Sequence, residues 1–392
     1  MLYYVVSRLW ILAPASFLWL AGCEAPGPAG STGLMDTRRL SERWRIGRTE
    51  EAGPELFGDI TALLVDGLGR LHVVDGLSRE VRVFDGDGAF LRTYGRPGAG
   101  PGELSAPVGI ASEPGGTVWI LDVANNRYSL YDTAGAHLAD LPRPASGYSV
   151  PWLGGFDPEG RLLDATFRST ARGNELILVR SDIMRDPEGV ASGIVPVDTF
   201  ALPLPPADRF LVYEIDSSGR RRGVSVSIPF TSGLRRELTP RGSVWEADTK
   251  RYRLVEFVPG GDTVRRVEKQ YSSVPVTRVA LDSALAELGA RTSPDLDYDL
   301  ERIPREWPAL ESFFGDAAGR LWVRPIERPP VPGFDLFEFE GGRRWRVESA
   351  VRIESTPRPE ARGDTLWGVS RDELGVLSVS KSVLDPVQAA SD

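Results

Sequence analysis

Short stretches of alternating apolar and polar residues, separated by glycine turns, recur through the first part of the chain. Between Asp59 and Pro142 one unit occurs twice: an apolar stretch, a Gly turn into a stretch that ends in Asp, and two further apolar stretches. Alternation with a period of two is typical of a β-strand with one buried face. Each unit therefore predicts four short strands joined by tight turns.

The turn that opens the second strand of the unit can be followed through the rest of the chain. A Gly, a polar residue and an apolar strand follow one another at Gly69, Gly116, Gly160, Gly242, Gly319 and Gly363. Three of the intervals between these turns are about 45 residues, the length of a four-stranded propeller blade, and the other two are about 80. The pattern therefore predicts an all-β fold, a six-bladed β-propeller of four-stranded antiparallel blades.

The two long intervals indicate insertions. The first contains one hairpin pattern at 210–228, which we interpret as elaborated outer strands of the third and fourth blades; a seventh blade remains the alternative. In the second, Leu281, Leu285 and Leu288 share one helix face and Gly289 follows as a stop signal. This pattern predicts a short helical insertion at about residues 277–308, lying over one face of the ring.

The last unit is one strand short, and the N-terminal part of the chain offers a strand without a unit. Residues 41–46 alternate polar and apolar side chains before the first full repeat begins. Pairing of strands from both termini would close the ring and remove exposed sheet edges. We therefore expect the propeller to span residues 41–392.

The first 23 residues have the pattern of a targeting segment. Arg8 precedes an apolar stretch from Leu9 to Leu20, which is short for a membrane span. The sequence Leu20-Ala21-Gly22-Cys23 follows and resembles the bacterial lipobox, which implies cleavage before Cys23 and acylation of its thiol. Because Cys23 is the single cysteine of the chain, it cannot form an internal disulfide. An ordinary secretory signal with an incidental Cys remains the alternative.

The expected lipid anchor predicts where the protein resides. Residues 24–40, rich in Pro, Gly and Ser at the start, are predicted to be a flexible tether between lipid and propeller. Acyl chains provide stable anchoring without a transmembrane helix. The residue after Cys23 is Glu24, whereas an Asp at this position would resemble an inner-membrane retention signal. This difference favours the outer membrane over the inner one. We expect a bacterial cell-envelope protein, periplasmic or surface-facing.

The first two units resemble NHL repeats. The resemblance rests on a strand ending in Asp, an Asn/Arg pair and an aromatic residue before Asp, at Trp119–Asp122, Asn125–Arg127 and Tyr131–Asp132, and more loosely at Asp75, Ser78–Arg79 and Phe84–Asp85. The linker Gly95–Leu104 is similar to one found in six-bladed propeller lipoproteins of environmental bacteria. The resemblance implies the fold, but this group has no uniform activity to transfer.

Composition excludes several classes of function. A net charge of -9 argues against a nucleic-acid partner, because phosphate binding needs clustered Lys and Arg. With only His72 and His137 as imidazoles and no free thiol besides Cys23, a zinc site or a nucleophilic triad is disfavoured. The sequence therefore favours a binding protein over an enzyme, without deciding between them.

Candidate functional residues fall into two sets. Asp75, Arg79, Asp122 and Arg127 occupy repeated positions and are expected to build the blades. The candidates for the channel or its mouth are charged residues near predicted inner strands: Glu103, Arg235, Glu237, Glu311 and Glu354. The innermost strands are otherwise mostly apolar or basic, so the Glu, Asn and Asp of a lactonase-like calcium site are not recognisable.

These observations predict a membrane-tethered, extracytoplasmic binding or scaffolding module for a protein, peptide or glycan. A sensor of a small molecule would differ only in ligand size. The alternative is a Ca²⁺-assisted, lactonase-like hydrolase with its site in the central channel, which requires at least three oxygen ligands to converge there. No other cofactor is expected.

Overall fold

The computed structural model describes residues 35–47, 53–144, 152, 154–171, 173–206, 208–215, 221–291, 298–327 and 332–387. The predicted signal peptide and Cys23 lie outside these residues. Within the described part, no helix combines the length and apolar character needed to cross a membrane.

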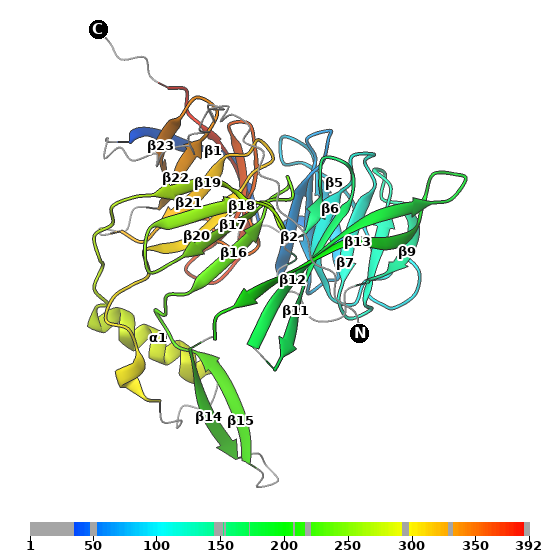
Figure 1. Cartoon of the computed structure of the whole chain (residues 1–392). Helices are drawn as coiled ribbons and strands as arrows, with labels where there is room; N and C mark the ends of the chain where they lie inside the picture. Colours follow the sequence, from blue (N-terminus) through cyan, green and yellow to red (C-terminus); the bar gives the residue numbers. More distant parts are fainter. Residues whose placement is uncertain are drawn as a thin grey trace, which may run out of the picture.

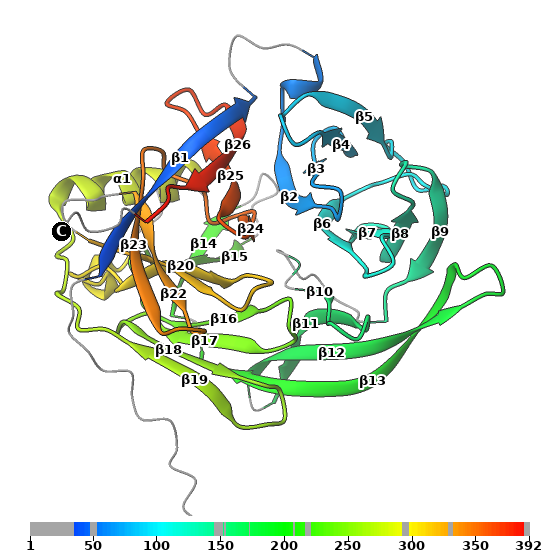
Figure 2. The same cartoon turned by 90° about the horizontal axis from the view of Figure 1, so that it is seen from above.

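The described chain folds mainly into antiparallel sheets arranged around a common centre (Figure 2). The first two four-stranded sheets consist of β2 (Ile60–Val65), β3 (Leu71–Asp75), β4 (Glu80–Phe84) and β5 (Phe90–Tyr94), then β6 (Pro107–Ser112), β7 (Val118–Asp122), β8 (Arg127–Tyr131) and β9 (His137–Pro142). The next two consist of β10 (Gly155–Phe156), β11 (Leu162–Thr170), β12 (Gly173–Arg185) and β13 (Ala191–Leu204), then β16 (Leu234–Leu238), β17 (Val244–Asp248), β18 (Arg253–Phe257) and β19 (Thr263–Glu268). This arrangement is an all-β propeller.

The remaining propeller strands form one eight-stranded sheet. In spatial order it contains β20 (Leu310–Gly315), β21 (Leu321–Pro325), β22 (Gly333–Glu338), β23 (Arg343–Ser349), β1 (Asp36–Ile46), β26 (Leu377–Leu384), β25 (Thr365–Arg371) and β24 (Glu360–Arg362). β1 pairs in parallel with β23 through its first half and antiparallel with β26 through its second half.

Two predictions are corrected by β1. Among the described residues there are four separate four-stranded sheets rather than six, because β1 joins the last two groups of strands into one sheet instead of completing a separate closing blade. The strand also begins at Asp36, so the end of the stretch expected to be a tether, residues 36–40, is bound to β23.

The recurrent glycines form the turns between the first and second strands. Gly69 has a φ of 76° and Gly319 a φ of 77°, a region that favours glycine, and each donates its N–H to a carbonyl three residues earlier. In these two turns the residue at that earlier position is Asp66 or Asp316. Its carboxylate accepts the N–H four residues later and pairs with the Arg there, at 2.6 Å for Arg70. This short-range bonding explains why the turns can be read from the sequence.

Large aromatic side chains fill the sheets at one repeated position, three residues after the turn Gly. Trp119, Trp245 and Trp322 are fully buried there, and His72 takes this place in the first sheet. Trp322 donates its indole Nε1 to the Asp316 carboxylate at 3.0 Å, and His72 Nε2 lies 3.2 Å from the equivalent Asp66. Burial lowers the pKa of His72, against the opposing effect of Asp66.

The insertions form a small unit beside the propeller. β14 (Arg209–Ile215) and β15 (Arg221–Ser227) pair only with each other. The expectation that this hairpin supplies outer strands of the third and fourth blades is therefore wrong. The hairpin lies with α1 (Arg278–Arg291) beyond one end of the sheets (Figure 1). The other helical elements of the described part are two short 3-10 helices, η1 (Gly53–Glu55) and η2 (Leu300–Arg302). The predicted apolar face of α1 packs on this hairpin through Leu281, Leu285 and Leu288, together with Phe210 and Ile228.

Candidate functional site

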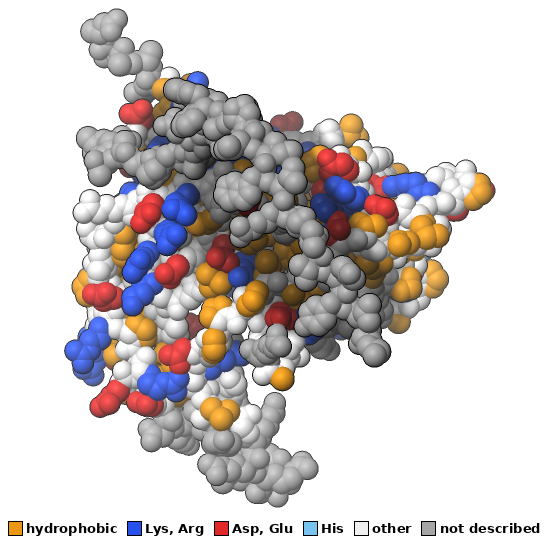
Figure 3. Space-filling view, viewed as in Figure 1, with side chains coloured by type: hydrophobic (Ala, Val, Ile, Leu, Met, Phe, Trp, Pro, Cys, Tyr) orange, Lys and Arg blue, Asp and Glu red, His pale blue; other side chains and the backbone are white. Residues whose placement is uncertain are grey.

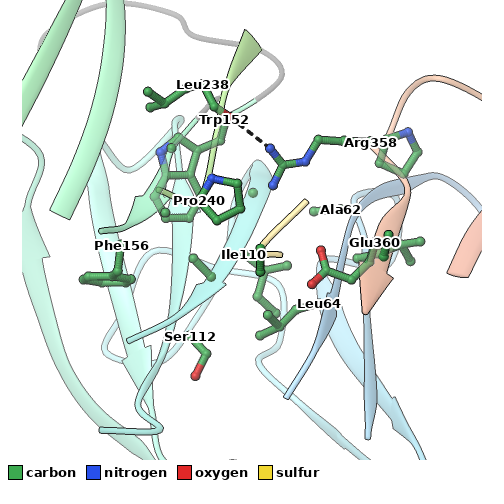
Figure 4. A pocket seen from close by; sticks show the side chains of 18 of the residues that line it. Ala62, Leu64, Ile110, Ser112, Trp152, Phe156, Leu238, Pro240, Arg358 and Glu360 are labelled. Carbon is green, nitrogen blue, oxygen red and sulfur yellow. Dashed lines mark hydrogen bonds between the residues drawn. The ribbon is translucent and has the colours of Figure 1, made fainter. Parts of the chain in front are cut away.

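A cavity of about 410 Å³ lies at the centre of the propeller (Figure 4). Its wall is contributed by β2, β6, the stretch at β10, the end of β16 with the turn after it, the turn after β20, and the segment around β24: Thr61, Ala62, Leu63, Leu64, Val108, Gly109, Ile110, Ala111, Ser112, Trp152, Gly154, Gly155, Phe156, Leu238, Thr239, Pro240, Ala317, Ala318, Pro357, Arg358, Glu360, Ala361, Arg362 and Gly363. A cavity of this volume falls within the usual range for small-molecule sites, about 300–1,000 Å³.

More than half of the described residues that line the cavity have apolar side chains. Leu64 on β2, Ile110 on β6, Phe156 on β10 and Trp152 are among these apolar side chains (Figure 4). Trp152 packs directly on the backbone of Gly109: a Cβ at that position would lie 2.5 Å from the Trp152 Cβ. Glycine is required there because any larger residue would push the indole out of the wall.

Within the described lining, the charged side chains come from one short segment, residues 358–362. Arg358 Nη1 donates to Glu237 Oε1 and to the Leu238 carbonyl, both at 3.2 Å. Arg362 Nη1 donates to the Asp66 carbonyl at 2.9 Å, and its Nε lies 3.6 Å from Glu360. Burial raises the pKa of Glu360, against the opposing effect of the two arginines. The segment therefore places cationic donors and one carboxyl group against an apolar wall.

A second, smaller cavity of about 60 Å³ adjoins the first, since Trp152 and Arg358 line both. Glu237, Arg324 and Glu354 also line it. Burial raises the pKa of Glu237 despite its ion pair with Arg358, and burial lowers the pKa of Arg324. Arg358 thus lies between the two spaces.

Four of the five predicted channel residues gather around this smaller cavity. Glu237 and Glu354 line it directly. The Glu311 carboxylate binds Arg324 at 3.4 Å and Arg352 at 2.6 Å, and the Glu311 carbonyl accepts from Arg235 at 3.0 Å. Glu311 and Arg235 are therefore neighbours of the space rather than part of its lining.

The fifth residue, Glu103, was expected at the channel mouth and lies elsewhere. It belongs to the loop between β5 and β6, where its carboxylate accepts the Gly100 N–H at 2.8 Å and pairs with Arg96 at 3.0 Å. The hydrogen bond from Gly100, followed by that from Arg96, lowers the pKa of Glu103. Its carboxylate stabilises this glycine-rich turn and is absent from the lining of both cavities.

The repeated Asp residues hold the chain that enters each blade. Asp75 accepts the N–H groups of Gly58 and Asp59, and Asp122 accepts those of Ser105 and Ala106, at 2.8–3.1 Å. Both carboxylates therefore anchor the backbone just before the first strand of their sheet.

The expected equivalence of Arg79 and Arg127 is wrong by one residue. Arg79 and Asn126 each lie four residues after the repeated Asp and share a positive φ, at 58° and 50°. Arg127 is the next residue and donates to the carbonyls of Gly100 and Glu103, both at 2.7 Å. Arg82, not Arg79, approaches Asp75, at 3.4 Å.

Sequence reasoning missed Arg358, Glu360 and Arg362, which carry the charge of the central cavity. They follow no motif and lie where the repeat is least regular. Their spacing at every second position is the signal that could have found them, because alternate residues of an extended segment point to the same side.

Among the described residues, no group of three or more His, Cys, Asp or Glu side chains is placed so that it could hold a metal ion. Among the described residues that line the central cavity, Glu360 is the single carboxylate. The three converging oxygen ligands required by the lactonase-like alternative are therefore not found in this part of the chain.

On the face seen in Figure 3, acidic and basic side chains are interspersed.

No known family model and no curated protein matches the chain. Solved structures with a similar arrangement include virginiamycin B lyase from Staphylococcus aureus, at 12% identity and a TM-score of 0.43, covering 87% of this chain and 99% of that chain. A DUF4221 family member from Bacteroides vulgatus has 9% identity and a TM-score of 0.43, covering 90% and 100%. The calcium-binding protein regucalcin from Agrobacterium tumefaciens has 14% identity and a TM-score of 0.33, covering 89% and 97%. At such low identities and scores, no activity transfers to this chain.

Proposed function

We propose that this protein is a binding propeller whose central cavity takes an apolar group of a small molecule or of a peptide. The observation that carries the proposal is the cavity itself, one space of about 410 Å³ walled by segments from every sheet of the propeller. Apolar walls with a few fixed polar groups are the usual composition of a ligand site, in which burial supplies affinity and the polar groups supply orientation.

We also propose that the propeller has six blade-like units with NHL-like repeats. The support is the strand order of the eight-stranded sheet, in which β20–β23 form one group of four and β24–β26 with β1 form another. The matching Asp anchors in the first two sheets support the repeat assignment. Six units around one axis would explain why six separate segments reach the same cavity.

Blocking the cavity tests the proposed function. The uncharged fluorophore N-phenyl-1-naphthylamine, whose emission rises in apolar surroundings, is titrated into the purified protein. Ile110→Trp places an indole in the cavity and is expected to weaken probe binding by at least about tenfold. The control Leu91→Trp adds the same side chain on the exposed outer strand β5, where 44% of the residue is accessible, and should leave binding unchanged. Equal binding by wild type and Ile110→Trp would contradict the proposal.

For the location we propose a lipid-anchored, extracytoplasmic protein, on the outer membrane rather than the inner one. The support is the apolar Leu9–Leu20 stretch followed by Leu20-Ala21-Gly22-Cys23. Cys23→Ser is expected to leave an unprocessed precursor or to release the protein from membranes, because the acylated thiol is removed. Immunoblotting of membrane and soluble fractions measures this, and unchanged processing and membrane attachment would contradict the anchor.

A further inference from the structure

Arg358 is held by one edge of its guanidinium group. A guanidinium carries five N–H donors, and Arg358 uses Nη1 for Glu237 and for the Leu238 carbonyl. Its Nε and Nη2 make no hydrogen bond within the part of the chain that the structure describes. The guanidinium group projects from the β24 side toward the cavity, opposite the ring of Trp152 (Figure 4).

The contacts of Nη1 restrict the orientation of the guanidinium plane. The Leu238 carbonyl belongs to the end of β16, and Glu237 precedes it on the same strand, so both acceptors are part of the sheet. Glu237 thereby acts as a positioning residue for Arg358. A guanidinium fixed in this way loses little conformational freedom when its remaining donors bind a ligand.

The remaining donors fit one kind of group. Neighbouring N–H donors of an arginine match the two oxygens of a carboxylate, and such charge-assisted pairs are shorter and stronger than neutral hydrogen bonds. Arg362 adds a second cation on the same segment, while Glu360 is paired with Arg362 at 3.6 Å. The apolar wall formed by Trp152, Ile110 and Phe156 lies opposite.

We infer that the ligand of the central cavity is an amphipathic carboxylate, with an aromatic or aliphatic body against Trp152 and Ile110 and its carboxylate on Arg358. This inference rests on the proposed function and makes it more specific. A ligand with an ammonium group, which would turn to Glu360, is the competing chemistry.

A matched set of competitors tests this inference. Bound N-phenyl-1-naphthylamine is displaced with 1-naphthaleneacetic acid, with its uncharged amide and with 1-naphthylmethylamine, which share one ring system. Wild type is expected to prefer the acid over the amide by about tenfold, the effect of one charge-assisted hydrogen-bonded pair. In Arg358→Met this preference should fall to within about twofold, while direct binding of the uncharged probe persists.

Two further variants keep the test independent of folding. Arg358→Met leaves Glu237 without its partner, so the double variant Arg358→Met with Glu237→Gln removes both charges and should show the same loss of preference. The control variant Arg266→Met removes an exposed arginine of the outer strand β19, which does not line either cavity. It should retain the wild-type preference for the acid over the amide.

The outcomes separate this inference from the proposed function. If wild type fails to bind the uncharged probe, the proposed function is wrong. If the probe binds but acid and amide compete equally, if the amine competes best, or if the variants lacking Arg358 keep the preference for the acid, the carboxylate assignment is overturned while the cavity remains a binding site.

Discussion

Replacing Asp164 with Asn is expected to destabilise the protein by about 3–5 kcal/mol, the usual cost of removing one partner of a buried ion pair. Asp164 on β11 accepts from Arg143 Nε at 2.7 Å and from Arg143 Nη2 at 2.8 Å. The two side chains are 3% and 1% exposed. Arg143 follows β9 of the second sheet, so the pair connects two neighbouring sheets. An amide in place of the carboxylate would remove the negative charge that Asp164 sets beside this buried guanidinium.

Urea unfolding of the variant and of wild type measures this effect. A more exposed pair within one sheet provides the control: Arg168 on β11 binds Glu175 on β12 at 2.7 Å, with side chains 56% and 23% exposed. Glu175→Gln should lower the free energy of unfolding by less than about 1 kcal/mol, because solvent screens the charges of such a pair. Equal losses for the two variants would mean that the Arg143–Asp164 pair adds nothing beyond a surface contact.

Trp322→Ala is expected to lower the free energy of unfolding by about 3–5 kcal/mol, because it leaves a cavity in the eight-stranded sheet. The indole is fully buried, stacks on Phe314 with a ring-centroid distance of 5.9 Å and meets Phe334 edge-on at 5.7 Å. The three rings pack in mutual contact, since Phe314 also meets Phe334 edge-on at 6.1 Å. Removing the indole therefore leaves empty space beside both phenylalanines. The same denaturation experiment measures the loss.

Trp322→Phe separates packing from hydrogen bonding. Phenylalanine keeps an aromatic ring between Phe314 and Phe334 but removes the indole N–H that donates to Asp316. Arg320 still binds that carboxylate at 2.7 Å, so we expect a loss well below that of Trp322→Ala. If the Phe variant lost as much stability as the Ala variant, the hydrogen bond to the turn, rather than the ring packing, would be the main contribution of Trp322.

Local signals allowed much of the fold to be predicted. The glycine turns, the helix with Leu281, Leu285 and Leu288, and the strand at 41–46 all depend on neighbours a few residues away, and the structure contains each of them. The hairpin at 210–228 was recognised as a hairpin but assigned to the wrong partner. Its pairing is local, whereas its packing on α1 is decided by residues about 70 positions away, which no strand pattern encodes.

The candidate site could be predicted only in part, for the same reason. Glu237 and Glu354 were selected as charged residues near inner strands, and they do line a space beside the centre. Glu103 was selected by the same argument and instead binds the backbone of its own loop. The sequence shows which residues are charged, but the side of the sheet that each one faces depends on a register that only pairing with another strand defines.

The sequence by itself determined the elements of this protein: strands from the period of two, turns from glycines that tolerate a positive φ, and the helix from its leucine face. Each of these follows from interactions within a few residues. Only the tertiary structure decided that β1 joins β23 to β26, and that Arg358 meets Glu237 across more than a hundred residues of chain to border the central cavity. These contacts depend on how whole sheets pack around a centre, because a cavity is formed by side chains that no local pattern places together.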